Sequence, residues 1–116
     1  MRRLFQIAAW LLLAIITLLS VVPPGDRPVT PAPHDVEHAA VFAAMGLAFG
    51  FGYARRYLLQ ALGLLGFCAA IELAQLGVPG RHARVSDFVV DALSVSVGIA
   101  VAFVLDQAGP YLTLRR

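Results

Sequence analysis

The sequence predicts an all-α fold, a transmembrane bundle of four helices with both termini in the cytoplasm. The first observation is composition: of 116 residues, 59% are hydrophobic and 14% are charged, whereas a soluble domain carries about 25% charged residues. The second observation is that four long apolar stretches are separated by short segments rich in Pro, Gly or Arg. We therefore expect one integral membrane domain over residues 1–116.

Each apolar stretch is about long enough to cross the membrane, since a helix needs about 20 residues to span about 30 Å of hydrocarbon. The first stretch is longer than the core of a secretory signal, and no A-x-A site follows it, so we expect it to be retained. The expected spans cover residues 4–22, 36–53, 57–77 and 88–105.

The arginines predict the orientation of the bundle. With the N-terminus in the cytoplasm, six arginines lie on the cytoplasmic side and three on the opposite side, as the positive-inside rule favours. The cytoplasmic set is Arg2, Arg3, Arg55, Arg56, Arg115 and Arg116; the opposite set is Arg27, Arg81 and Arg84. Since the arginines are scattered in pairs, the sequence does not favour a nucleic-acid partner.

Small residues recur at every fourth position in three of the spans, which predicts closely packed helices. The rows are Gly46, Gly50 and Ala54; Gly66, Ala70 and Ala74; and Ser94, Gly98 and Ala102. Membrane lipids are the expected surroundings. The small-residue rows also allow the chain to form a homo-oligomer. Cys68 is the only cysteine, so a disulfide within the chain is excluded.

Most other polar side chains lie on the side of the bundle opposite the termini. Glu72 and Asp91 are set into apolar sequence, where an ionised carboxylate costs about 2.5 kcal/mol or more. We therefore expect both to point inward, with Arg81 as their counter-charge. The alternative is that this cluster only locks the hairpin. The candidate ligand-binding residues are Glu37, His38, Glu72, Gln75, Arg81, Asp87 and Asp91.

The order of these residues resembles the VanZ-like family, small bacterial membrane proteins named for a teicoplanin-resistance protein. The resemblance rests on His38, Glu72-x-x-Gln75, Pro79-Gly80-Arg81 and Asp87. Asp91 stands where the family commonly has Asn. The resemblance implies a multi-pass protein of the bacterial inner membrane, association with the cell envelope and a contribution to antibiotic resistance, but no defined reaction.

Three classes of function follow from these features. The first is a polar pocket that binds the head group of an envelope lipid, a lipid-linked glycan precursor or a glycopeptide. The second is a membrane-surface transferase or hydrolase, in which His38 with Glu37, or the Asp87–Asp91 pair, acts as general base and Arg81 holds a phosphate. The third is a structural partner that assembles with another membrane protein through its small-residue faces.

No cofactor or metal is expected from the sequence. His38, Glu72, Asp87 and Asp91 are acceptable ligands for a divalent ion. However, they belong to three helices and lack the tight spacing that marks a metal site.

Overall fold

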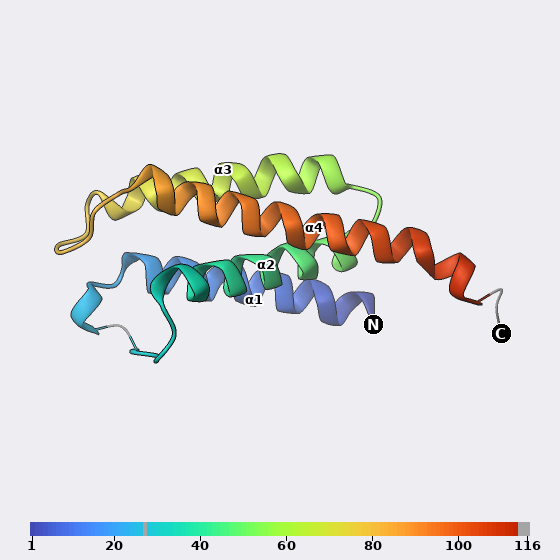
Figure 1. The fold of residues 1–116 in the computed structure, drawn as a ribbon, viewed down its shortest axis with the longest axis horizontal. Coiled ribbons are helices and arrows are strands. Elements are labelled where there is room, and N and C mark those ends of the chain that lie inside the picture. The colour runs from blue at the N-terminus through green and yellow to red at the C-terminus, as the bar shows by residue number, and fades with distance from the viewer. Residues whose placement is uncertain (27, 114–116) are drawn as a thin grey trace.

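The computed structural model describes residues 1–26 and 28–113, and all regular structure in these ranges is helical (Figure 1). The elements are α1 (Arg2–Val21), a short 3-10 helix η1 (Pro24–Asp26), α2 (His34–Gly52), α3 (Tyr57–Gln75) and α4 (Val85–Thr113). The predicted helical bundle is therefore confirmed in the described part of the chain. Arg27, Arg115 and Arg116 lie outside the described residues.

The helices form two hairpins that pack through α2 and α4. α1 packs on α2, α3 packs on α4, and the most extensive contact between the two hairpins joins α2 to α4. Both hairpin connections, residues 22–33 and 76–84, lie at one end of the bundle (Figure 1), which we call the hairpin end. The N-terminus and the α2–α3 turn lie at the other end, which we call the arginine end after Arg2, Arg3, Arg55 and Arg56.

Three helices in the described chain, α1, α3 and α4, are long and apolar enough to cross a membrane. Four spans were expected, and α2 is the exception because its first turns carry His34, Asp35, Glu37 and His38. α2 is also the helix that contacts both α1 and α4 most closely. Of its polar residues, Glu37 and His38 are half-buried, whereas His34 and Asp35 are exposed at the hairpin end.

The outward faces of the other helices are apolar. Leu11 on α1, Leu62 on α3 and Leu93 on α4 are 57%, 62% and 62% exposed. Monomeric soluble proteins rarely expose large continuous apolar surfaces, whereas lipid-facing helices require them. The packing thus agrees with the composition in indicating a membrane protein.

α2 and α4 approach so closely that their backbones touch at two glycines. A Cβ atom on Gly98 would lie 2.3 Å from the carbonyl oxygen of Ala43, and one on Gly46 would lie 2.3 Å from that of Val95. The predicted close packing is confirmed for these two helices. The row on α3 was expected to pack as well but faces outward, since its residues Gly66, Ala70 and Ala74 are exposed.

Candidate functional site

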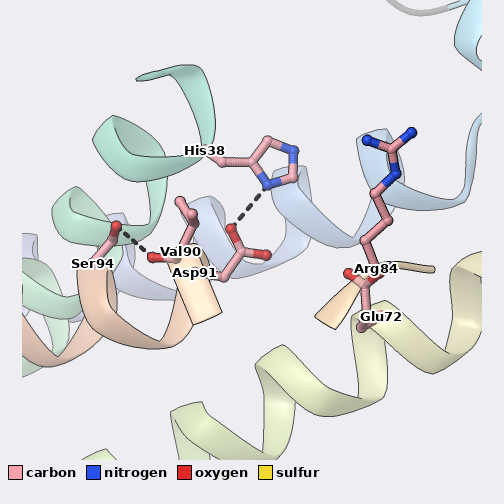
Figure 2. Close-up of polar contacts among 6 residues, drawn as sticks. All are labelled: His38, Glu72, Arg84, Val90, Asp91 and Ser94. Atoms are coloured by element: carbon pink, nitrogen blue, oxygen red, sulfur yellow. Dashed lines mark hydrogen bonds and ion pairs between the residues drawn. The ribbon is translucent and has the colours of Figure 1, made fainter. Parts of the chain in front are cut away.

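Just inside the hairpin end, a histidine of α2 meets a carboxylate of α4 (Figure 2). His38 Nδ1 lies 2.9 Å from Asp91 Oδ1, and the His38 and Asp91 side chains are 15% and 1% exposed. Because a carboxylate only accepts, Nδ1–H is the donor in this bond. The contact fixes the orientation of the imidazole ring, as carboxylates do in acid–base sites.

Asp91 has a second oxygen that the surrounding protein does not satisfy. Its Oδ2 atom is buried and has no hydrogen-bond partner within residues 1–26 and 28–113. Buried polar atoms nearly always have a partner, whether protein, water or ligand. Oδ2 is therefore the atom of this site at which a further donor is expected.

Glu72 is the third member of this buried layer, and it comes from α3. The side chain is 8% exposed, and its Oε1 accepts a hydrogen bond from the backbone N–H of Arg84. The Arg84 side chain extends away from the Glu72 carboxylate (Figure 2). Asp87, Asp91 and His38 all lie within electrostatic range of Glu72. The buried layer itself, made of His38, Glu72 and Asp91, contains two acidic groups and one imidazole.

Arg81 has partners other than those predicted. It was expected to neutralise Glu72 and Asp91, but its Nε donates to the carbonyl oxygen of Val22 at 2.9 Å and its Nη2 to that of Leu19 at 2.7 Å. Carbonyls at the C-terminal end of a helix lack partners within the helix and carry a partial negative charge. Arg81 therefore caps α1 and ties it to the α3–α4 connection.

A polar cavity of about 400 Å³ opens at the hairpin end. It brings together Gln75, Arg81 and Asp87 from the predicted set with four residues that were not predicted to take part in binding. Those four are His34, Asp35, His82 and Arg84. The cavity is thus lined by two arginines, two histidines and two aspartates in one small volume.

The buried layer lies one helical turn below this cavity on each helix. His38 follows His34 by four residues, Asp91 follows Asp87 by four, and Glu72 precedes Gln75 by three. One turn advances about 5.4 Å along the axis. The predicted residues therefore divide into a cavity lining and a buried layer, and Figure 2 shows the buried layer.

Glu37 lies apart from both groups. Its Oε1 accepts a hydrogen bond from the Thr30 hydroxyl, and it lines a different cavity of about 380 Å³ between α2 and the end of α1. His38 also borders this second cavity. Residues 37 and 38 are successive on a helix and therefore point in different directions.

Sequence reasoning missed His34 because the Pro-rich segment before it suggested a loop. In the structure Pro33 precedes α2 directly, and His34 is its first residue. The four-residue step from His34 to His38 was the available signal, since this spacing places both rings on one helix face. Their ring centroids are 4.2 Å apart.

Within the described ranges, no three His, Cys, Asp or Glu side chains are grouped closely enough to hold a metal ion.

Comparisons with known proteins found no match. No protein-family model, no curated protein and no solved structure matches the chain. The resemblance to the VanZ-like family therefore rests on the motif residues alone.

Proposed function

We propose that this protein is a VanZ-like membrane protein of the bacterial cell envelope whose cavity at the hairpin end binds a polar head group. The ligand class is an envelope lipid, a lipid-linked glycan precursor or a glycopeptide. The observation that carries the proposal is the charged cavity of about 400 Å³ at one end of an otherwise apolar bundle. Ionisable groups at the membrane are costly and mark functional sites by default.

The composition of the cavity favours a ligand with both acceptor and donor groups. The Arg84 guanidinium suits a phosphate or carboxylate, because its planar fork can form two parallel hydrogen bonds. Asp35 and Asp87 suit amino or hydroxyl groups of a sugar or peptide. Four of the residues that carry the VanZ-like resemblance line this cavity, namely Gln75, Gly80, Arg81 and Asp87, so the motif and the cavity support the same site.

Binding measurements with two cavity variants test the proposal. Arg84→Gln and Asp87→Asn each remove one charge from the lining, whereas Ser86→Ala changes an exposed neighbour that does not line the cavity. We expect weaker binding of teicoplanin or of a polyprenyl-diphosphate-linked muropeptide for the first two variants only. Equal binding by all three variants and the wild type would exclude this cavity as the site.

The proposal includes an orientation, with the arginine end in the cytoplasm and the hairpin end outside. It is supported by the four arginines at one end, against Arg81 and Arg84 at the other. Because Cys68 is buried, a single added thiol can report the topology. We expect Ser86→Cys to react with a membrane-impermeant maleimide in intact cells and Arg55→Cys to react only after lysis. The reverse pattern would overturn this orientation.

A second candidate, a membrane-surface transferase or hydrolase, is favoured by the His38–Asp91 bond. A carboxylate that orients an imidazole is the arrangement of a general base. If the protein turns over a lipid-linked substrate, His38→Gln should abolish turnover and leave substrate binding in place. If the wild type binds the substrate but does not turn it over, the enzymatic function is excluded and only the binding function stands.

A further inference from the structure

A third cavity, at the arginine end, is built differently from the polar cavity at the hairpin end. It has a volume of about 430 Å³ and lies between α1, the end of α2 and the first half of α3. Its walls are mainly apolar and aromatic, with Trp10, Phe49, Leu64 and Phe67 among them. We call it the arginine-end groove.

One polar side chain in this groove has an oxygen atom without a hydrogen-bond partner among the described residues. Gln60 is 8% exposed, and its Nε2 donates to the carbonyl oxygen of Tyr53 at 2.6 Å. Its Oε1 is buried and has no hydrogen-bond partner in residues 1–26 and 28–113. A buried acceptor without a partner is unfavourable, so a bound molecule that supplies a donor at this point would relieve the cost.

The groove changes from polar to apolar along α3. Arg56 and Gln60 line it at the start of the helix, one turn apart, and Gly63, Leu64 and Phe67 line it further in. From Gln60 to Phe67 the helix rises about 10 Å. A ligand that matches this course has a charged head, a hydrogen-bond donor near the head and an apolar chain.

The surroundings of the polar end are positively charged. Arg3 lines an adjoining cavity that shares Trp10 and Tyr53 with the groove, and Arg55 precedes Arg56 in the turn. The described lining residues of both cavities include no carboxylate. The head of the ligand is therefore expected to be an anion.

We propose that the arginine-end groove binds an anionic phospholipid whose head group carries a hydroxyl, such as phosphatidylglycerol. The phosphate pairs with Arg56, a head-group hydroxyl donates to Gln60 Oε1, and an acyl chain lies along Leu64 and Phe67. A fatty acid supplies the anion but no donor, and phosphatidylcholine supplies neither a donor nor a net charge. The proposal is independent of the polar cavity, which lies at the other end of the bundle.

Two glycines of α3 provide a matched test. A Cβ atom at Gly63 or at Gly66 would meet no atom within 4 Å, but only Gly63 lines the groove. Gly63→Leu therefore places a bulky side chain at the groove with no clash at its Cβ atom, and Gly66→Leu adds the same side chain outside the groove. Native mass spectrometry of the full chain, released from micelles containing phospholipids of identical acyl chains, measures which lipid is retained.

We expect the wild type and Gly66→Leu to retain phosphatidylglycerol in preference to phosphatidylethanolamine and phosphatidylcholine, and Gly63→Leu to lose this retention. Arg56→Gln should weaken phosphatidylglycerol binding about fivefold, the effect of one interfacial arginine on an anionic lipid. Phosphatidylmethanol has the same charge without the hydroxyl, so the wild type should bind it less tightly, whereas Gln60→Leu should bind both equally. Full retention by Gly63→Leu, or equal retention of phosphatidylcholine by the wild type, would overturn the proposal.

Discussion

Gly98→Ala is the substitution that most directly tests the contact between α2 and α4. The added Cβ would lie 2.3 Å from the carbonyl oxygen of Ala43 and 2.8 Å from the backbone nitrogen of Leu47. Carbon and carbonyl oxygen normally approach no closer than about 3.3 Å, so the two backbones would have to separate by about 1 Å. Neither contact involves a flexible side chain that could move aside.

The expected cost is about 2 kcal/mol, within the range for inserting a methyl group into a well-packed interior. The same separation would also disturb the site. Asp91 lies two turns from Gly98 on α4, and about 1 Å of extra distance would take the 2.9 Å bond to His38 out of hydrogen-bonding range. Stability and ligand binding should therefore fall together.

Equilibrium unfolding in mixed detergent and SDS micelles measures this effect. Gly66→Ala is the control, because Gly66 is exposed and its added Cβ would meet no atom within 4 Å. We expect Gly98→Ala to unfold at a lower SDS fraction and Gly66→Ala to unfold no earlier than the wild type. Wild-type stability of Gly98→Ala, or equal destabilisation by both, would refute the close contact.

Three further substitutions test single contacts by the same unfolding measurement. Arg81→Ala removes two charge-assisted hydrogen bonds to the end of α1 and should lower the free energy of unfolding by about 2 kcal/mol; Arg81→Lys should restore only part of this. His38→Ala leaves buried Asp91 without its partner and should cost about 3 kcal/mol, whereas His38→Gln should cost less. Tyr57→Phe removes the bond to exposed Asp106 and should cost less than about 1 kcal/mol. If Arg81→Ala, His38→Ala or Tyr57→Phe is as stable as the wild type, the contact that the substitution removes does not stabilise the protein.

The positions of the helices could be predicted from the sequence because apolar runs and Pro, Gly and Arg interruptions are local signals. Residues 57–77 were expected to be helical and α3 covers Tyr57–Gln75. α4 continues beyond the expected end at residue 105, since the polar Asp106 there does not interrupt it. An exposed carboxylate can stand at the end of a helix or within its last turns, so Asp106 did not indicate where α4 ends.

The partners of charged side chains could not be predicted in the same way. Spacing placed Glu72 and Asp91 toward the interior, and both are buried. It did not show that Arg81 reaches α1, which lies about sixty residues earlier, because a long flexible side chain can select among several acceptors. The outward-facing Gly66 also shows that a row of small residues identifies one face of a helix but does not show whether another helix packs against that face.

The position of α2 at the centre of the bundle has a consequence for biogenesis. α2 is synthesised before α4, its principal neighbour, and, unlike α1, α3 and α4, it is not among the described helices that are long and apolar enough to cross a membrane. We therefore expect α2 to enter the membrane only after α4, the helix it packs against, has been synthesised. A ribosome-bound chain truncated before residue 85 should leave α2 accessible to water, and completion of α4 should draw it into the bilayer.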